Sequence, residues 1–514
     1  MNTLRPDQTL PASEYCSSIA QPHTGENKKT TPLALIDGNV KPDTPYSSIP
    51  ATHKIPQNPS TLDSYALFKD ATINVSRECT VRKSEVGAYP PKLVTDTLTI
   101  KTGDGDDIVH VSKGENGHLR ITINDSTYDV KLAPKQTLKI QTEGGNDCIK
   151  VDADVDTEIQ IEGGSGDDHI WAGSGRTRVF GGAGGDHIYL GAGTSYAEGG
   201  DGNDWIQAGK GRAVIYGNNG DDVIQGYVGP GGKPAYMDGG SGRDQLRGGT
   251  SHTVMNGGLD DDKLSSVGRG TFYTGKGRDT IISTYDSDLI YAKKDDFIQK
   301  TTAAKLTLIS PSDAGKTAFS LEGSAEFKQR INDDLEMLRG SPAGQEMLSE
   351  LDRMTKRNGF PLRVLEVQAE DVNFYTGHND YYDNLINTGQ KLPVGEDPKL
   401  GTLLNGQRGD IMNSGDVFSN RSYVLEGQVN RSPLSAFYHE LSHAYNFGNG
   451  TVFPGRTNDE LNLERQAVGV ETDADEFDFD DDPLTPPTNT NPYPFNENAL
   501  HAEMGEPLRD RYRG

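Results

Sequence analysis

Glycine and aspartate recur with a fixed period between residues 95 and 285, and this repeat constrains the fold of the 514-residue chain more than any other feature. An aspartate followed two positions later by an apolar residue, as in Asp168 and Ile170, returns at 18-residue intervals as far as Asp222. The interval is 22 across an insert at 228–234, and then 18 and 17. A unit of this length cannot bury its apolar face alone, so successive units must stack around a continuous core. The series comprises Asp107, Asp147, Asp168, Asp186, Asp204, Asp222, Asp244, Asp262 and Asp279.

The best-preserved units are residues 163–171 and 199–207, each with glycines, an aspartate and one inward apolar residue in nine positions. They resemble the nonapeptide of RTX-type parallel β-rolls, in which glycine-rich corners alternate with short strands. Two nonapeptides make one coil of 18 residues. We therefore predict a parallel β-solenoid over residues 95–290, followed by a connector over residues 291–317 that caps it.

Every second nonapeptide lacks the aspartate, because Thr177, Ser195 and Ala213 take its place in three successive coils. Calcium needs several oxygen ligands, with carboxylates to balance its charge. One edge of the solenoid therefore keeps corners that suit calcium, whereas the other edge has lost them. The alternative is that the aspartates only cap turns and hold no metal. The candidate calcium ligands are Asp168, Asp186, Asp204 and Asp222.

The repeat pattern says less about the role of the solenoid. Stacked coils form a long surface that suits the docking of a substrate or partner. In RTX-type proteins calcium also drives folding after export, whereas a cytosol with little calcium would leave weak sites empty. A docking surface and a plain spacer therefore both stay open. Because coils contact mainly their neighbours, we expect a fragment that starts near Lys316 to fold by itself.

The segment 437–445 contains two histidines four positions apart, His439 and His443, with Glu440 directly after the first. On a helix the two imidazoles lie one turn apart on the same face and can hold one Zn²⁺. Glu440 is then placed to take a proton from the attacking water. Ser432 and the proline after it predict the start of this helix, and glycines after the segment predict its end.

A catalytic zinc site needs a third protein ligand and one open position. No third histidine follows at the spacing of the longer His-Glu-x-x-His-x-x-Gly-x-x-His pattern. Glu464, 21 residues after His443 in a short predicted helix, is the candidate, and Glu460 and Asp459 are its rivals. The rivals can also be explained as acidic residues that favour a helix N-terminus.

From about residue 319 onward the chain resembles the NleD-like effector metallopeptidase family. The resemblance rests on His439-Glu-Leu-Ser-His-Ala-Tyr445, on Glu464-Arg-Gln-Ala-Val-Gly469, and on motifs that begin at Asn496 and Glu503. It implies a zinc endopeptidase that Gram-negative bacteria inject into host cells by type III secretion, with Glu464 as the third ligand. It also implies a host protein as substrate, with signalling kinases as candidates, and a secretion chaperone as a partner.

Residues 318–514 are accordingly predicted to form an α+β metallopeptidase domain of the zincin type. Apolar residues at helical spacing predict two helices, which begin after Ser324 and after Ser341. Strands are predicted at 362–367 and 422–429, and a loop or hairpin region at 399–420.

Two features near the C-terminus bear on catalysis. Tyr512 is a candidate to stabilise the oxyanion that forms when a peptide bond is attacked, because a phenol can donate a hydrogen bond to it. The alternative for Tyr512 is a packing role. Eight of the twelve residues at 471–482 are acidic, which predicts a solvated loop, or an acidic rim that favours basic substrate segments.

The composition excludes several other classes of protein. A net charge of −26 argues against nucleic-acid binding. No run of 18 apolar residues occurs, so no membrane span is predicted. Three widely spaced cysteines predict no disulfide framework and a reducing compartment. Residues 1–60 lack apolar periodicity and predict a disordered leader, which the resemblance implies is a secretion signal, and residues 61–94 form a segment before the repeats.

Together these features predict a secreted bacterial effector that works in the host cytoplasm as a zinc-dependent endopeptidase. Zn²⁺ is the expected cofactor of the C-terminal domain, and Ca²⁺ is the candidate ion of the repeats. The alternative is a calcium-dependent, RTX-like binding protein whose peptidase-like domain is inactive.

Overall fold

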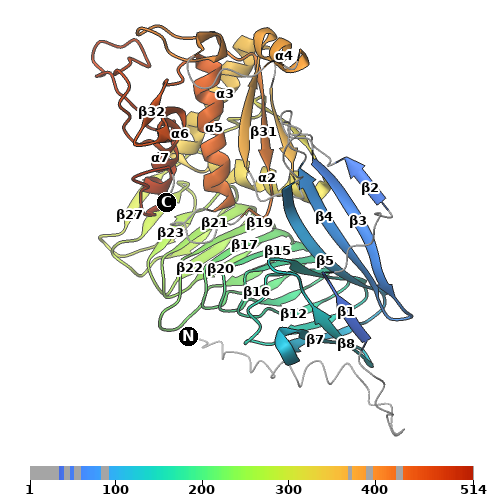
Figure 1. Cartoon of the computed structure of the whole chain (residues 1–514). Coiled ribbons are helices and arrows are strands. Elements are labelled where there is room, and N and C mark those ends of the chain that lie inside the picture. The colour runs from blue at the N-terminus through green and yellow to red at the C-terminus, as the bar shows by residue number, and fades with distance from the viewer. Residues whose placement is uncertain are drawn as a thin grey trace, which may run out of the picture.

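The computed structural model describes residues 34–39, 47–50, 60–82, 92–359, 361–367, 373–388, 390, 397–423 and 432–512. The predicted leader, residues 1–60, lies largely outside these residues. Two long sheets and a smaller mixed α/β unit make up the described fold (Figure 1).

The repeats form a parallel β-solenoid of about ten coils over residues 138–308, as predicted. Each coil adds one strand to each of two facing sheets. The first sheet holds β1 (Ala34–Asp37), β8 (Ser126–Lys131), β7 (Leu119–Ile123), β6 (Ile108–Lys113), β10 (Cys148–Val151), β12 (His169–Trp171), β14 (His187–Tyr189), β16 (Trp205–Gln207), β18 (Val223–Gln225), β20 (Gln245–Gly248), β22 (Lys263–Ser266), β24 (Thr280–Ile282) and β26 (Phe297–Gln299), in this spatial order.

The second sheet begins with antiparallel strands from the segment before the repeats and continues as parallel solenoid strands. Its spatial order is β2 (Ser47–Pro50), β3 (Ser60–Lys69), β4 (Asn74–Arg82), β5 (Lys92–Asp104), β9 (Thr137–Gly144), β11 (Ile159–Ser165), β13 (Thr177–Ala183), β15 (Ser195–Asp201), β17 (Ala213–Asn219), β19 (Ala235–Ser241), β21 (Thr253–Leu259), β23 (Gly270–Tyr273), β25 (Leu289–Ala292) and β27 (Lys305–Leu308).

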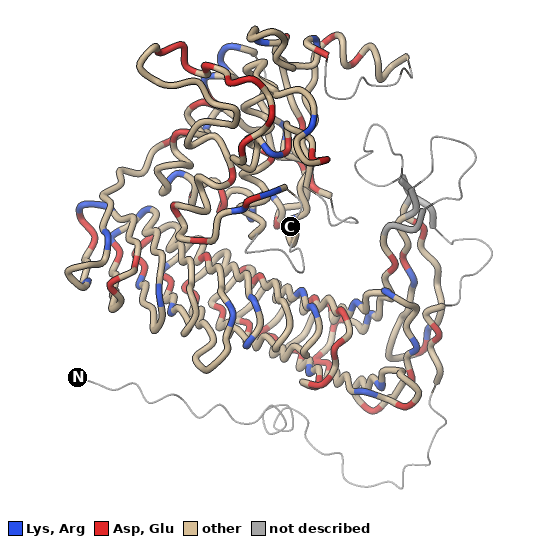
Figure 2. Tube along the Cα trace, turned by 60° about the vertical axis from the view of Figure 1, so that its left-hand side comes forward, with Lys and Arg blue, Asp and Glu red and all other residues tan. Residues whose placement is uncertain are grey.

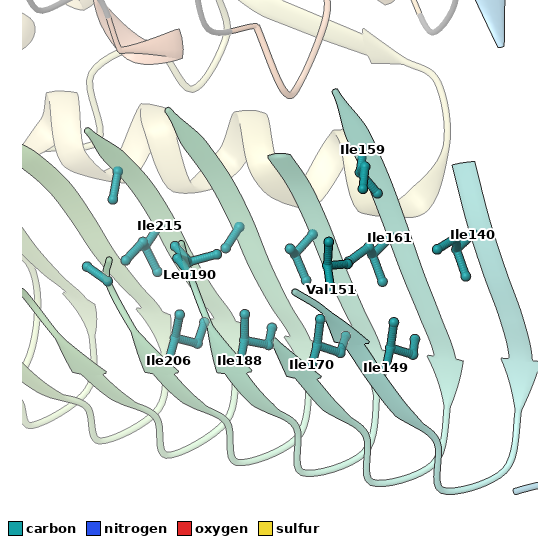
Figure 3. Close-up of a cluster of buried hydrophobic side chains, with 14 of the residues drawn as sticks. Ile140, Ile149, Val151, Ile159, Ile161, Ile170, Ile188, Leu190, Ile206 and Ile215 are labelled. Atoms are coloured by element: carbon teal, nitrogen blue, oxygen red, sulfur yellow. The ribbon is translucent and has the colours of Figure 1, made fainter. Parts of the chain in front are cut away.

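The core of the solenoid is a ladder of aliphatic side chains. Ile170, Ile188 and Ile206 stand in register on neighbouring strands and are fully buried (Figure 3). Residues such as Ile161 and Ile215 face them from the second sheet. Full burial of one such side chain stabilises the fold by about 1.5–3 kcal/mol, so the repeated apolar position holds the coils together.

Glycine is required where adjacent coils approach at the corners. Gly200 has a φ of +121°, and a Cβ added there would lie 1.9 Å from the carbonyl oxygen of Gly182 in the preceding coil. Both the backbone conformation and the close contact therefore exclude a side chain.

The solenoid extends further than the boundary predicted from the sequence. The strands β26 and β27 lie within residues 291–317, which were assigned to a connector, and they pair in parallel with β24 and β25. The aspartate series also gains one member, Asp296, which the sequence analysis missed because its corner lacks the glycines.

The C-terminal part is an α+β unit, as predicted. Its sheet has the order β28-β29-β31-β30, in which β30 alone runs antiparallel to its neighbour. The elements are β28 (Phe319–Glu322), α2 (Ala325–Arg339), α3 (Pro342–Asn358), β29 (Leu362–Glu366), β30 (Phe374–His378), α4 (Asp380–Asn387), β31 (Ser414–Ser419), α5 (Pro433–Asn449), β32 (Arg456–Thr457), β33 (Glu460–Leu461), α6 (Asn462–Val468) and α7 (Glu497–Met504).

Local sequence signals located the helices better than the strands. The hydroxyls of Ser324 and Ser341 accept backbone N–H groups at the starts of α2 and α3. A loop or hairpin region was predicted at 399–420, but residues 414–419 of this stretch form β31, an interior strand of the sheet. Six residues flanked by glycine and asparagine carry little periodic signal. Most of the strand predicted at 422–429 lies outside the described residues.

The α+β unit lies against the outer face of the second sheet (Figure 1). Outward-facing tyrosines of the solenoid, including Tyr216 and Tyr236, are buried in this contact. The guanidinium of Arg330 in α2 lies 3.7 Å from the centroid of the Tyr216 ring and 2.7 Å from the carboxylate of Asp334. The coils therefore contact more than their neighbours, and the two parts share one core.

Two further observations concern covalent and membrane features. Of the cysteines in the described residues, Cys79 is buried with its thiol 3.7 Å from Asp96, and Cys148 is disulfide-bonded, although the sequence predicted no disulfide framework. None of the described helices combines the length and apolar content that a membrane crossing requires.

Candidate metal centre

The helix α5 carries the two histidines through the interior of the α+β unit. Its first turn is capped by Ser432, whose hydroxyl accepts the N–H of Ser435, and Gly450 ends it at a φ of +66°. Apolar neighbours such as Phe437 and Leu441 are buried on all sides, so the helix is held rigidly. A rigid helix fixes the direction of both imidazoles.

Three side chains converge on one point. The Nε2 atoms of His439 and His443 lie 3.1 Å apart, and the Oε2 atom of Glu464 lies 3.2 Å from each of them. Ligand atoms that surround a tetrahedral zinc at 2.0–2.1 Å stand about 3.3 Å from one another. Among the described residues this is the group of three whose ligand atoms could share an ion, and its geometry fits zinc.

The electrostatics of Glu464 suit a metal ligand. Burial by itself would raise the pKa of this carboxyl, but the imidazoles of His443 and His439 outweigh it and hold the pKa well below its usual value. Glu464 is therefore ionised and ready to bind a cation. The first turn of α6 places it there.

The two rival carboxylates lie elsewhere. Glu460 forms an ion pair of 2.9 Å with Arg465 and accepts the backbone N–H of Tyr512. Asp459 is exposed. Neither contributes to the group formed by His439, His443 and Glu464.

Glu440 follows His439 on α5 and is 5% exposed. The ring of Tyr512 stacks on His439 at a centroid distance of 5.8 Å and an interplanar angle of 21°. Tyr512 is half-buried, and its carbonyl accepts a hydrogen bond from Arg509. Tyr512 therefore lies against one of the candidate ligands, and Glu440 is the buried residue next to that ligand in the chain.

Glu497, the first residue of α7, has no role predicted from the sequence. Its Oε2 atom lies 2.9 Å from Nδ1 of His439, and its side chain is fully buried. Arg509 donates to the same carboxylate over 2.8 Å. A carboxylate behind a metal-binding histidine sets the tautomer and orientation of the ring. The sequence signal nearest to Glu497 is the capping residue Asn496. It predicts the start of a helix but not the contact of Glu497 with His439.

A second set of candidate ligands runs along one edge of the solenoid. In each corner Oδ1 of the aspartate accepts the backbone N–H of the aspartate one coil earlier, for example over 2.8 Å from Asp168 to Asp186. These carboxylates are at least 98% buried from Asp168 to Asp222. Burial raises the pKa of Asp168 to about 7 and that of Asp186 to about 8.

The second oxygen of these aspartates is unaccounted for. The Oδ2 atoms of Asp168, Asp186, Asp204 and Asp222 are buried and have no hydrogen-bond partner among the described residues. A Cβ at Gly181 would meet Asp186 Oδ2 at 2.2 Å and the carbonyl oxygen of Gly199 at 2.5 Å, so each corner brings a carboxylate and a carbonyl together. Turn capping thus explains Oδ1 only, and the unpaired Oδ2 atoms fit a bound cation.

Family models match both halves of this architecture. Residues 315–512 match the Peptidase M91 family, which is described as effector protein. Residues 162–196, 198–230 and 236–264 match the RTX calcium-binding nonapeptide repeat. The chain thus joins a stretch similar to RTX repeats to a C-terminal region similar to Peptidase M91 effector proteins. No curated protein and no solved structure shows significant similarity to the chain.

These matches agree with the layout predicted from the sequence, in which RTX-type repeats precede an effector region. The Peptidase M91 region contains α5, α6 and α7 and therefore all the residues that converge on the candidate metal centre. The RTX matches cover Asp168, Asp186, Asp204 and Asp222, and support calcium binding by this edge of the solenoid. Both features are typical of secreted proteins.

Proposed function

We propose that the Peptidase M91 region of this chain is a zinc-dependent endopeptidase that cleaves a host protein. The observation that carries the proposal is the convergence of His439, His443 and Glu464 at separations of 3.1–3.2 Å, which suits a tetrahedral ion with one position left open. When bound, zinc supplies Lewis acidity towards a carbonyl oxygen and lowers the pKa of water.

The side chains of the chain carry the proton transfers. Glu440 takes the proton of the attacking water on its carboxylate and then delivers it to the nitrogen of the departing amine. Tyr512 donates a hydrogen bond from its phenol to the oxyanion as the carbonyl carbon becomes tetrahedral, and it keeps its proton. Glu497, which is held by Arg509, keeps Nδ1 of His439 protonated so that Nε2 faces the cation.

The family match to effector proteins supports action outside the producing cell. We infer injection into the host cytoplasm by type III secretion, assisted by a secretion chaperone, and a host protein as substrate. Signalling kinases are the first candidates. The run 471–482 forms a loop with mostly exposed acidic side chains, and acidic residues are prominent along the loops of this region (Figure 2). Such a rim favours substrates with basic segments.

The second candidate function is calcium-dependent binding by the repeats, with an inactive peptidase-like region. The unpaired Oδ2 atoms along the solenoid favour calcium binding. They do not separate the two functions, because an enzyme can hold calcium in its repeats as well. The complete set of three ligands beside Glu440 favours the enzyme.

Metal analysis combined with proteolysis tests the proposal. The purified full chain should contain one zinc, and it should generate new N-termini when it is incubated with host lysate and the products are analysed by mass spectrometry. Glu440→Gln should keep the zinc and reduce cleavage by roughly 10²–10⁴-fold. The matched control is Glu346→Gln at an exposed position of α3, which should cleave like the unmodified chain. Absence of zinc together with unchanged cleavage by Glu440→Gln would overturn the enzyme proposal.

A further inference from the structure

The last corner of the aspartate ladder differs from all the others. The second corner residue, which is glycine in most coils, pairs in register with its equivalent in the next coil, as Gly182 does with Gly200 and Gly240 with Gly258. Two residues beyond the pair Tyr273–Tyr291 the same register places Lys293 beside Gly275. The final coil therefore has a lysine where the coils from Gly164 to Gly275 have glycine or, at Asn218, asparagine.

The side chain of Lys293 turns into this corner. Its ammonium lies 2.6 Å from Oδ2 of Asp279, 3.1 Å from Oδ1 of Asp296 and 2.9 Å from the carbonyl oxygen of Gly275. The hydroxyl of Thr274 is 3.3 Å away. Both carboxylates are fully shielded from solvent, and the lysine side chain is 12% exposed. Oδ2 of Asp296 lies at 3.3 Å, so five oxygens surround one positive charge.

The earlier corners have the same carboxylate geometry without the ammonium. Oδ1 of each aspartate accepts the N–H from the preceding coil, as Asp279 does from Asp262 over 2.9 Å. Oδ2 is paired by Lys293 at Asp279, whereas in the earlier corners it is buried and without a hydrogen-bond partner among the described residues. The corners with such an unpaired Oδ2 are those of Asp147, Asp168, Asp186, Asp204, Asp222, Asp244 and Asp262.

We propose that Lys293 is a tethered cation that occupies, in the last corner, the place that calcium takes in the corners before it. The proposal rests on calcium binding by the repeats and is independent of the proposed peptidase activity. An ammonium satisfies the two carboxylates and the carbonyl with its hydrogen bonds and its charge, so this corner needs no metal. It also blocks the corner, because the nitrogen lies at hydrogen-bonding distance from the oxygens that an ion would bind.

Lys293 lies in the coils that contact the α+β unit, so the last corner affects how that unit is supported. The coils next to it support the α+β unit: the hydroxyl of Tyr291 donates to the carbonyl of Glu503, and that of Thr271 donates to the carbonyl of Met504, both at the end of α7. A last corner closed by Lys293 keeps this support folded at low calcium. Loss of calcium then loosens the ladder from the earlier coils and leaves the coils beneath α7 in place.

Hydrogen–deuterium exchange of the unmodified full chain provides the first test. Peptides that cover Asp186 and Asp204 should be protected in calcium and exchange faster in EGTA. Peptides that cover residues 275–299 should exchange at the same rate in both. Equal dependence on calcium in the two regions would overturn the proposal, and this measurement does not depend on the folding of any variant.

The second test opens the last corner. Lys293→Met keeps most of the apolar stem and removes the charge, so equilibrium dialysis with calcium should find one more bound ion per chain than in the unmodified protein. Its melting temperature should fall in EGTA and recover in calcium. Lys294→Met, at the exposed neighbouring position, should match the unmodified protein in both measurements. An unchanged calcium stoichiometry, with a melting loss that calcium does not reverse, would assign Lys293 a merely structural ion pair.

Discussion

His439 is held at both of its ring nitrogens. Nδ1 faces the buried carboxylate of Glu497, and Nε2 faces His443 and Glu464. Rotation of the ring would break contacts on both sides. His439, a candidate metal ligand, is thus oriented by a residue on another helix, and the precision of the candidate site depends on α7 as much as on α5.

Glu497→Gln should weaken zinc binding without unfolding the chain. The amide keeps the shape of the side chain but removes the charge that favours a protonated Nδ1, and such changes typically cost about 10–100-fold in metal affinity. Competition with a chromophoric chelator measures this loss. Glu346→Gln, at an exposed position of α3, is the matched control. An unchanged zinc affinity would show that Glu497 serves packing alone.

Glu464→Ala should abolish zinc retention on gel filtration. Two imidazoles leave the cation under-coordinated, because a catalytic site needs three protein ligands. Elemental analysis of the eluted protein gives the zinc content. Full occupancy in this variant would mean that the third ligand was chosen wrongly, and Glu460 would be tested next.

The repeated element of the solenoid is one corner and two short strands, and its aspartate has two separate tasks. Oδ1 links consecutive coils by accepting a backbone N–H. Oδ2 is buried without a hydrogen-bond partner among the described residues and is the candidate ligand for a cation. The two tasks respond differently to substitution. Alanine removes both oxygens, but asparagine keeps the Oδ1 acceptor and loses only the charge.

The double variant Asp186→Asn and Asp204→Asn should therefore reduce the stabilisation by calcium and leave the melting temperature in EGTA nearly unchanged. Calcium stabilises the native chain by mass action, and neutral side chains bind it weakly. Differential scanning calorimetry in calcium and in EGTA measures both quantities. If the unmodified chain melts at the same temperature in calcium and in EGTA, the aspartates are turn caps only.

On the scale of the whole molecule, the solenoid and the α+β unit are packed as one body. Tyr273 donates to Oε1 of Glu503 over 3.0 Å, and Oε2 of the same carboxylate accepts the N–H of Ala343 over 2.8 Å. Glu503 thereby joins the solenoid, α3 and α7. Because α7 also carries Glu497, the coils below it support the metal centre through a single short helix.

A fragment that starts at Lys316 should fail to fold stably, contrary to the expectation from the sequence alone. It would expose the face of α2 with Arg330 and Ile331, which are 1% and 2% exposed in the full chain. Exposing an apolar side chain such as Ile331 forfeits about 1.5–3 kcal/mol of the stability that its burial contributes, and the solenoid covers several such side chains. Circular dichroism melting and zinc content of the fragment test this prediction. A cooperative transition with one bound zinc would show that the unit is autonomous.

The contact between the two parts should also make stability depend on pH. Asp238 is 1% exposed beneath α2, and burial raises its pKa to about 7. The unfolded chain ionises this group near pH 4, whereas the folded chain keeps it protonated until about pH 7. The stability of the fold therefore falls as pH rises through this range, by about 4 kcal/mol at most.

Asp238→Asn should remove part of that fall. The amide has no charge to bury, so the loss of melting temperature between pH 5 and pH 8 becomes smaller than in the unmodified chain. Asp295→Asn, at an exposed position, serves as the control and should keep the full loss. A variant with an undiminished loss would show that other groups govern the pH dependence.

The sequence by itself determined whatever is local or periodic. The 18-residue spacing dictated stacked parallel coils, because each apolar position has one neighbour to pack against. His439 and His443 share a helix face because of their spacing, and Ser324, Ser341 and Ser432 mark helix starts because capping needs only the next few residues. The convergence of Glu464 on the two histidines agrees with the ligand chosen from the sequence.

Only the tertiary structure decided the contacts between distant segments. Glu497 meets His439 across 58 residues of chain, and Tyr273 meets Glu503 across 230. Lys293 belongs to no sequence motif, and its proposed role as a tethered cation depends on the strand register that places its ammonium beside Asp279. No spacing rule predicts such pairs, because the packing of the α+β unit on the second sheet and the stacking of the last coil create them.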